Sequence, residues 1–466
     1  MMKYIKHKIQ SKLQFALVLL LSALAVSSCI NDDNEFVDPN NGTGLVTFSV
    51  KVPGQSLPST YALTEADENE IRNIDVLVFD QYGKYTGLRL SPDILRREGN
   101  DVLFTVRIPE GERYQINVFA NVRDLLDKRF SSSLIKGQSK DEIFSKLYIQ
   151  NTGRWKFDND GGDSYRPLPM WGEIPSLTVS STTPTRNVVH MIRALAKVNV
   201  IAENGIEIKE IFIIKRQNTG LFAPAPVNWD AKTLKVTKAT PAGTKEVTQL
   251  VYVPQGNQST NEIYLFESDN TSYGIQNKDR NCVIITAYYK NTSYYYRLDF
   301  GSYANDRMNY VDILRNHSYT FRIKSINHPG YFNMEDAING EPINIGSGGT
   351  EGNLEIIDNT NIGYAIFDDK YFLGVTGKEL TFQGDPNHNN DADLWIATNS
   401  PNGYQVTSVE GGGGWLSVNR QHEGRPTTIA CGLVMQPNNT GRDRTGYINI
   451  EAGGLRLRVK VTQKSA

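Results

Sequence analysis

The residue with the clearest chemical role in this sequence is a cysteine near its start. Cys29 follows the apolar run Phe15–Val26 and the small residues Ser27 and Ser28, and four lysines precede that run. The run is too short to cross a bilayer as a helix but is typical of a signal peptide. We therefore expect cleavage between Ser28 and Cys29 and a lipid on the Cys29 thiol. A secretory signal with an incidental cysteine is the alternative.

No other set of residues forms a catalytic or metal-binding pattern. Neither a His-x-x-x-His nor a Cys-x-x-Cys pair occurs, so we expect no zinc site. The loops 158–164 and 385–393 are rich in carboxylates but read as solvated turns, with an irregular calcium site as the alternative. The glycine-rich segment 410–415 lacks the lysine of a phosphate-binding loop and is predicted to be a hairpin loop. We expect no enzyme activity, no metal and no cofactor other than the lipid on Cys29.

The composition favours a chain of β-domains. A length of 466 residues is enough for about three domains, and 49 basic against 51 acidic residues give no basic face for nucleic acid. Tyrosine, phenylalanine and glycine are frequent, which favours strands joined by tight turns. Cys282 and Cys431 fall in different candidate domains, so we expect two buried free thiols and no disulfide.

Strand-like segments recur along the chain and divide it into units. The first, 44–53, alternates apolar and polar side chains with a period of two, whereas parts of 123–150 read as short helices. We predict an all-β fold of two consecutive β-sandwiches and a third, small β-sandwich. The predicted boundaries are a signal peptide over 1–28, a flexible tether over 29–43, and sandwiches over 44–185, 186–345 and 354–466.

An aromatic strand in the second sandwich is predicted to serve packing rather than ligand stacking. Within 294–300, Tyr296 and Leu298 share one face with two other aromatic residues, whereas Arg297 and Asp299 lie on the other face. One apolar and one polar face is the pattern that a sandwich strand requires.

Several segments together resemble the fimbrillin superfamily of Bacteroidales, the subunits of type V pili. The residues before Cys29 resemble a lipobox, 60–85 resembles the start of a mature pilin, and 191–200 resembles the first strand of the second pilin domain. The most specific resemblance is "DILRNHSYTFRIKSINHPGY" at 312–331. The resemblance implies two transthyretin-like β-sandwiches, export to the outer membrane as a lipoprotein, and assembly with other subunits in a surface-exposed fimbrium.

The C-terminal unit resembles a different family, the Bacteroidetes-associated carbohydrate-binding (BACON-like) domain. The segments that carry this resemblance are 394–406, 415–418, 438–454 and 459–463. It implies a further β-sandwich, in which Trp395 and Trp415 are candidate glycan contacts. Membership of the core is the alternative for each tryptophan, and a spacer is the alternative for the domain.

The resemblance to fimbrillins also implies assembly by strand exchange. In that superfamily a protease cuts after an arginine between the first two strands, the first strand leaves, and a strand of the next subunit enters the groove. Repetition of this step builds an open polymer. Strand exchange predicts that 44–53 is a removable strand over an apolar groove. A central strand that leaves only when the domain unfolds would contradict it.

Two features depart from the fimbrillin pattern. The candidate maturation region at Tyr61 and Ala62 has a tyrosine where an arginine is expected, and no arginine occurs between Cys29 and Arg72. The C-terminal segment 455–466 reads as the last strand of the third sandwich, already paired, rather than as a free donor strand.

These departures favour a fimbrial tip subunit that accepts a strand, mediates adhesion and meets a host or bacterial glycan or a protein receptor. An anchoring or accessory subunit that keeps its lipid in the outer membrane is the first alternative, since it fits the missing arginine. A free-standing surface lipoprotein that binds glycans is the second alternative.

Overall fold

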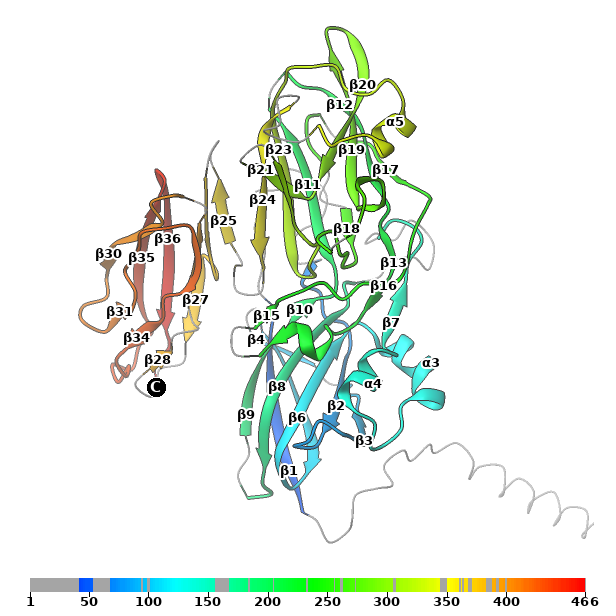
Figure 1. Cartoon of the computed structure of the whole chain (residues 1–466). Helices are drawn as coiled ribbons and strands as arrows, with labels where there is room; N and C mark the ends of the chain where they lie inside the picture. Colours follow the sequence, from blue (N-terminus) through cyan, green and yellow to red (C-terminus); the bar gives the residue numbers. More distant parts are fainter. Residues whose placement is uncertain are drawn as a thin grey trace, which may run out of the picture.

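The chain folds into three β-rich units (Figure 1). The computed structural model describes residues 42–52, 68–93, 95–98, 101–155, 167–182, 185–203, 205–231, 234–254, 256–259, 263–272, 274–304, 307–343, 350–359, 362, 364–367, 371–382, 388–390, 394–398 and 400–465. The first two units stand one above the other, and the third lies beside them (Figure 1). The prediction of an all-β chain of sandwich units is confirmed, whereas the predicted signal peptide lies outside the described residues.

The first unit is a sandwich of two sheets around one apolar core. One sheet has the order β4 (Arg96–Glu98), β5 (Asp101–Pro109), β1 (Thr43–Lys51) and β9 (Thr185–His190). The other has the order β10 (Ile192–Arg193), β8 (Met170–Val179), β6 (Gly111–Ala120), β2 (Ile74–Phe79) and β3 (Tyr85–Leu90). Both sheets contribute fully buried side chains, among them Phe48, Val76 and Val118. Along β1 the apolar side chains alternate towards this core, whereas β2 is buried at every position, so its sheet is covered on both faces.

Two helices, α3 (Arg123–Ser133) and α4 (Lys140–Phe144), follow β6 where short helices were predicted. The start of α4 is fixed by a capping box, in which Ser139 and Glu142 satisfy each other's backbone N–H groups. At its end, Phe144 is buried with its ring edge-on to three other aromatic rings, including Trp171 at 6.0 Å between centroids. The helix thus closes one side of the first core.

The second unit is also a sandwich. Its sheets have the orders β18 (Ile263–Leu265), β11 (Ala196–Ala202), β23 (His317–Ile326), β24 (Thr350–Asp358), and β17 (Leu250–Tyr252), β12 (Ile208–Ile214), β19 (Cys282–Tyr289), β20 (Thr292–Asp299). Smaller ladders are β16 (Ala242–Lys245), β13 (Gln217–Leu221), β7 (Tyr148–Gln150); β14 (Trp229–Asp230), β15 (Lys235–Val236); and β21 (Gly301–Ala304), β22 (Arg307–Tyr310). Short 3₁₀ helices span Pro226–Asn228 and Asn277–Asp279.

The second half of the aromatic strand β20 is buried on both faces. Tyr296 and Leu298 are fully buried in the second core, as predicted. The polar face is buried too, since Arg297 and Asp299 form an ion pair at 2.7 Å with no exposed side-chain surface. The helix α5 (Met334–Asn339) covers this face, and the Arg297 guanidinium donates to the carbonyl of Ile338 at its end. The polar face is covered because the chain folds back over the sheet after β23.

The first and second units share apolar packing at their junction. The first core continues into second-unit residues such as Phe222 and Phe266. The rings of Trp155 and Phe266 meet edge-on at 6.4 Å, and β7 pairs with β13 across the junction. Beneath them, Arg315 and Glu267 form a buried ion pair at 2.8 Å. This continuous packing restricts movement between the two units.

The third unit holds a separate core. Its sheets have the orders β25 (Tyr364–Phe367), β26 (Phe372–Val375), β29 (Trp395–Thr398), β33 (Thr427–Ala430); β27 (Glu379–Phe382), β36 (Leu455–Gln463), β35 (Arg444–Ala452), β30 (Tyr404–Glu410), β32 (His422–Glu423); and β28 (His388–Asn390), β34 (Leu433–Met435), β31 (Leu416–Val418).

The segment 410–415 joins β30 to β31, which lie in different sheets. The prediction of a hairpin loop there was wrong.

Two unit boundaries differ from those predicted. Division at 185 assigns β9 to the second sandwich, but β9 pairs with β1, and β10 pairs with β8. The first unit therefore continues to Arg193. Likewise, β24 pairs with β23 over its whole length, so the second unit continues to Asp358 rather than ending at 345. The strands β9 and β24 each pair with a strand that lies well before them in the chain. The apolar periodicity of a strand does not reveal such a partner.

Candidate strand-exchange site and ligand pocket

The first described strand, β1, is an interior strand of its sheet. It pairs in antiparallel fashion with β5, where Phe48 faces Phe104, and in parallel with β9, where Phe48 faces Asn187. A parallel ladder between two segments so far apart in the chain needs no local turn. Removal of β1 would therefore leave a slot with two unpaired edges.

The buried face of β1 fills an apolar groove, and the strand is central in its sheet. Its removal without unfolding of the domain, which strand exchange requires, stays a prediction. Val46, Phe48 and Val50 have at most 1% of their surface exposed. The ring of Phe48 stacks on Phe104 with 5.1 Å between centroids. The opposite face is more open, and Leu45 is 43% exposed. A strand inserted in place of β1 would need apolar side chains at alternate positions to fill the same groove.

The chain is anchored again at Glu68, where the described residues resume after β1. The Glu68 carboxylate is 3% exposed, pairs with the Lys197 ammonium, and accepts a hydrogen bond from the Tyr264 hydroxyl at 2.7 Å. Lys197 and Tyr264 belong to the second unit, on β11 and β18. Arg193 donates to the Glu68 carbonyl and to the side chain of Asn69. This Glu68 anchor ties the start of the next segment to the junction.

The charge state of Glu68 follows from these partners. Burial favours the neutral acid and by itself would raise its pKa. The positive charges of Lys197 and Arg193, with the hydrogen bonds from Lys197 and Tyr264, oppose burial and hold the pKa of Glu68 below its ordinary value of 4.5. The anchor is therefore an ionised, hydrogen-bonded pair at neutral pH, the arrangement that buried charges require.

The last strand, β36, is also interior. It pairs in antiparallel fashion with β35 and in parallel with β27. Gly453 and Gly454, with φ of 58° and 93°, form the two-residue turn between β35 and β36. The prediction of an already paired C-terminal strand agrees with this register.

The two candidate sugar contacts lie in different surroundings. Trp415 is 8% exposed within the third core, and its indole N–H donates to the Gly411 carbonyl at 3.1 Å. The Arg444 guanidinium covers its ring at 4.5 Å. Trp415 is therefore a core residue, and its prediction as a glycan contact was wrong. Trp395 is only partly buried.

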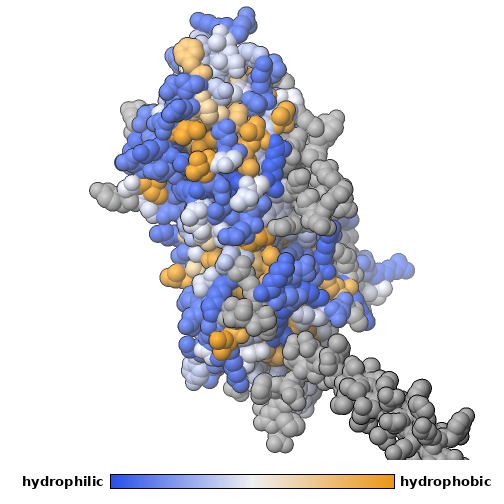
Figure 2. Space-filling model, turned by 90° about the vertical axis from the view of Figure 1, so that its right-hand side faces the viewer, coloured by the Kyte–Doolittle hydropathy of each residue, from blue (hydrophilic) through white to orange (hydrophobic). Residues whose placement is uncertain are grey.

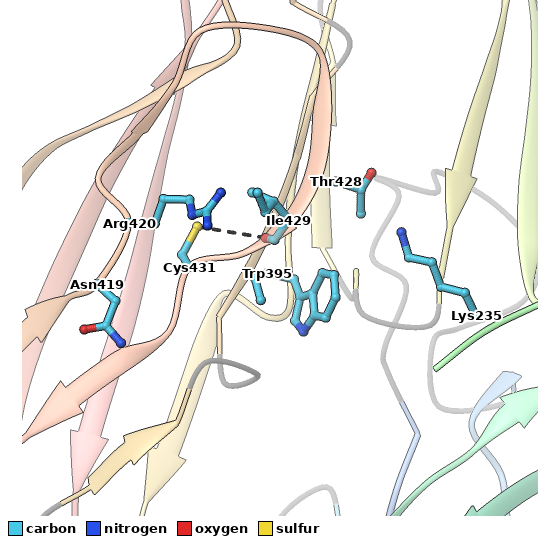
Figure 3. Close-up of a pocket in the computed structure, with 8 residues that line it drawn as sticks. Lys235, Trp395, Asn419, Arg420, Thr428, Ile429 and Cys431 are labelled. Atoms are coloured by element: carbon cyan, nitrogen blue, oxygen red, sulfur yellow. Dashed lines mark hydrogen bonds between the residues drawn. The ribbon is translucent and has the colours of Figure 1, made fainter. Parts of the chain in front are cut away.

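Trp395 lines a cavity of about 470 Å³ where the third unit faces the second (Figure 3). The lining residues are Lys235, Trp395, Asn419, Arg420, Thr428, Ile429, Ala430 and Cys431. Lys235, on β15 of the second unit, places its ammonium 5.8 Å from the Trp395 ring. Sequence reasoning found Trp395 but missed Lys235 and Arg420, because nothing in the spacing of these residues connects them. We call this cavity the Trp395 pocket.

The two described cysteines are free and buried, as predicted. Burial raises the pKa of both thiols, and that of Cys431 rises to about 11. Both thiols are therefore neutral at physiological pH. Among the described residues, no three His, Cys, Asp or Glu side chains come together as a metal site.

Other predicted residues lie outside the described part of the chain. These are Ser28 and Cys29 of the lipid site, Tyr61 and Ala62 of the maturation region, and most of the two carboxylate-rich loops. In the described ranges, no helix has the length and apolar character needed to cross a membrane. On the face shown in Figure 2, apolar residues form separate spots among hydrophilic ones, and the largest gathering lies over the upper unit.

Two family models match the chain. Residues 38–340 match the family described as "Fimbrillin-A associated anchor proteins Mfa1 and Mfa2". Residues 405–464 match the BACON family, described as "Putative binding domain, N-terminal". The first match covers the first unit and the second as far as the end of α5, before β24, and the second match falls within the third unit.

Curated and solved proteins show the same likeness. The chain is 25% identical to the "Major fimbrium tip subunit FimE" of Porphyromonas gingivalis, over 91% of this chain and 72% of that protein. A solved "fimbrial assembly protein" from Parabacteroides distasonis is 13% identical, with a TM-score of 0.37, over 61% of this chain and 92% of the other. A "Putative cell adhesion protein" from the same organism is 12% identical, with a TM-score of 0.43, over 68% of this chain and 99% of the other.

Proposed function

The chain belongs to the family of fimbrillin-A associated anchor proteins Mfa1 and Mfa2, and from this premise we propose that it is an adhesive subunit at the tip of a cell-surface fimbrium. In this proposal the chain is exported as a lipoprotein through Cys29 and joins the next subunit by strand exchange at β1. The name of the curated relative, a fimbrium tip subunit, supports the tip position.

The proposal is carried by a contrast between two strands. Removal of β1 would open an apolar groove, whereas β36 is already paired on both sides within its own unit. The slot of β1 is lined by the apolar groove around Phe104 and bounded by β5 and β9. The strand β36, in contrast, is held on both sides within the third unit. Such a subunit can accept a neighbour's strand in the groove of β1 but has no free β36 to donate. This combination is expected of a tip subunit with an outward-facing third unit.

The interior position of β1 sets a requirement on the exchange. Both ladders of β1 must open, and the rest of the first unit must stay folded while they do. The Glu68 anchor supports this, because it holds the segment after the maturation region through buried contacts that do not involve β1. A cut in 53–67 would separate β1 from the chain without breaking those contacts.

An anchoring subunit that keeps its lipid is the second candidate. The missing arginine between Cys29 and Arg72 favours it, because an arginine-specific cut could not remove the lipidated segment there. The two candidates differ in their N-terminus: the anchor starts at lipidated Cys29, and the tip subunit starts near Ala62.

N-terminal sequencing of the protein extracted from the cell surface, with immunogold labelling of its third unit, tests the proposal. We expect a start near Ala62 and label at the distal ends of fimbriae. A start at lipidated Cys29 with label at the envelope would establish the anchor instead. A protein absent from fimbriae would contradict both candidates.

Strand exchange is tested separately with a specific protease site inserted within 53–67. After cleavage, a labelled peptide of residues 43–51 should replace β1, while circular dichroism of the remaining chain stays unchanged. The matched peptide with Phe48→Asp should not enter, because a charge would be buried in the groove. Loss of the native spectrum when β1 leaves would show that the strand is released only by unfolding and would exclude exchange.

A further inference from the structure

The slot that β1 occupies is narrow near its start. Gly44 is buried there, and it faces the core opposite Ile108 of β5. A Cβ added to Gly44 would lie 2.5 Å from the carbonyl oxygen of Ser180 and 2.6 Å from a methyl carbon of Val179, where β8 ends in the opposite sheet. A backbone carbonyl cannot turn away as the end of a flexible side chain can. Only a glycine therefore fits at this position of the slot.

The three core-facing positions that follow set the size of the side chains. Val46, Phe48 and Val50 are fully buried, and the Phe48 ring stacks on Phe104. A charged side chain at any of the three would be buried without a partner, and a small one in place of Phe48 would leave a cavity. The slot thus requires aliphatic, aromatic and aliphatic residues at alternate positions after the glycine.

The outer face of β1 adds one further requirement. Leu45 is 43% exposed, and Thr47 is partly exposed, with its hydroxyl 3.0 Å from that of Thr105. Ser49, in contrast, is 1% exposed, and it faces Leu103 across the ladder. A strand in the slot can carry varied side chains at the first two outer positions, but a long charged side chain in place of Ser49 would be buried.

The strand β24 from a second copy of this chain does not meet these requirements. Gly352 matches Gly44 in spacing, and Leu354 and Ile356 follow it on the face that packs against the second core. In that register, however, Asp358 takes the fourth core-facing position and places its carboxylate in the apolar groove. A shift of two residues replaces the glycine by a residue with a Cβ, and a shift of one turns the polar face of β24 inwards.

The strand β36 from a second copy fails for a different reason. If Gly453 takes the glycine position, Arg458 falls at the buried position of Ser49. If Gly454 takes it, Arg456 and Arg458 point into the core. Every other register of β36 puts a side chain against the end of β8. Neither β24 nor β36 therefore fits the slot of another copy.

We infer that the β1 slot accepts a strand from a different subunit and rejects β24 and β36 of a second copy of this chain. The strand that fits has the order glycine, any residue, aliphatic, any residue, aromatic, small and aliphatic. The inference rests on the proposed strand exchange. It adds the sequence pattern of the partner, and it assigns this chain a single place in a fimbrium rather than a place in a polymer of itself.

Competition between peptides tests the inference on the whole chain, cleaved at the protease site inserted within 53–67. A labelled peptide of residues 43–51 reports occupancy of the slot by fluorescence anisotropy. The unlabelled peptide with Gly44→Val should compete at least about tenfold more weakly than the native one, because it is overpacked against β8. Leu45→Val, the matched control at the next and exposed position, should compete like the native peptide. Equal competition by the two variant peptides would overturn the inference.

A repaired β24 peptide tests the pattern in the opposite direction. The peptide of residues 351–359 should not compete, because its aspartate would be buried. With Ile356→Phe, Ile357→Ser and Asp358→Val it acquires the aromatic, small and aliphatic residues of the pattern, and it should then compete within about tenfold of the native peptide. Competition by the unmodified peptide, or none by the repaired one, would overturn the inference.

The native peptide separates this inference from the proposed function. If labelled 43–51 does not enter the cleaved chain, strand exchange itself is contradicted, and the inference fails with it. If the native peptide enters and the variants compete equally, exchange stands and only the partner pattern is contradicted. Sedimentation velocity of the cleaved chain under the same conditions should show a monomer. A polymer of this chain alone would overturn the inference and leave strand exchange intact.

Discussion

The strands β1 and β36 occupy equivalent positions in different units, yet they are connected in opposite ways. Each has nine residues and lies between one antiparallel and one parallel neighbour. The two-glycine turn keeps β36 beside its partner β35, so β36 re-forms its ladder locally after any opening. Both partners of β1 are distant in the chain, and a cut in the connection after it would leave β1 held by non-covalent contacts alone.

This difference shows how one kind of sheet position can serve two purposes. A terminal strand with a local partner closes its unit, because the entropy cost of re-forming a short hairpin is small. A terminal strand with only distant partners can be replaced once it is separated from the chain, since nothing local favours its return. In the proposed exchange, the first unit is the acceptor, and the third unit is closed by its own last strand.

The largest expected effect comes from the side chain that fills the groove beneath β1. Phe48→Ala should lower the free energy of unfolding of the first unit by about 3–5 kcal/mol, because it leaves a cavity beside Phe104. Urea denaturation followed by far-UV circular dichroism measures it. If Phe48→Ala unfolds at the same urea concentration as the wild type, β1 is not the strand that completes this core.

A comparable effect is expected at the Glu68 anchor. Glu68→Gln should destabilise the junction by about 3–5 kcal/mol, because the Lys197 charge remains buried without its partner. The surface pair of Glu70 and Arg72 supplies the control, and Glu70→Gln should cost less than about 1 kcal/mol. Equal destabilisation by the two variants would contradict a specific role for Glu68.

The anchor should also be sensitive to acid. The pKa of Glu68 is lowered on folding, so its stabilising contribution is complete above its ordinary value of 4.5 and is lost as the pH falls through the folded value. The difference in unfolding free energy between the wild type and Glu68→Gln should therefore shrink as the pH falls through the folded pKa of Glu68. If this difference in unfolding free energy stays constant down to acidic pH, the protonation of Glu68 is not linked to folding.

A smaller effect is expected at the turn that holds β36. Gly453→Ala should lower the stability of the third unit by about 1–3 kcal/mol, because a Cβ at a φ of 58° is strained and would meet the Tyr371 ring. Gly454 also has a left-handed φ of 93°, but a Cβ there would meet open space, so Gly454→Ala should cost only the backbone strain and not the clash. Thermal unfolding compares the two variants, and the reverse order would contradict this account of the turn.

The smallest effects are expected on the exposed faces of both strands. Leu45→Ala on β1 and Arg458→Ala on β36 should each change the unfolding free energy by less than about 1 kcal/mol, because Leu45 is 43% exposed and the Arg458 pair with Glu410 lies in solvent. Urea denaturation of each variant measures the change. A large loss at Leu45 would show that the outer face of β1 is covered in solution.

The position of the candidate pocket shows where sequence reasoning stopped. Trp395 and Trp415 could not be told apart from the sequence, since each lies in a strand-like segment of the same unit. The structure places Trp415 in the core beside Arg444 and leaves Trp395 partly buried, opposite Lys235 of another unit. Position relative to other strands, rather than residue type, separates the two tryptophans.

Local periodicity and residue type were enough to predict the all-β character, the alternation that buries Phe48 on β1, the short helices and the free buried thiols. The return of β9 to β1, the extension of the second unit by β24 and the burial of the Arg297–Asp299 pair under α5 emerged only from the folded chain. The physical reason is that a strand's own pattern specifies which faces are apolar, whereas its partners are selected by packing between residues far apart in the chain.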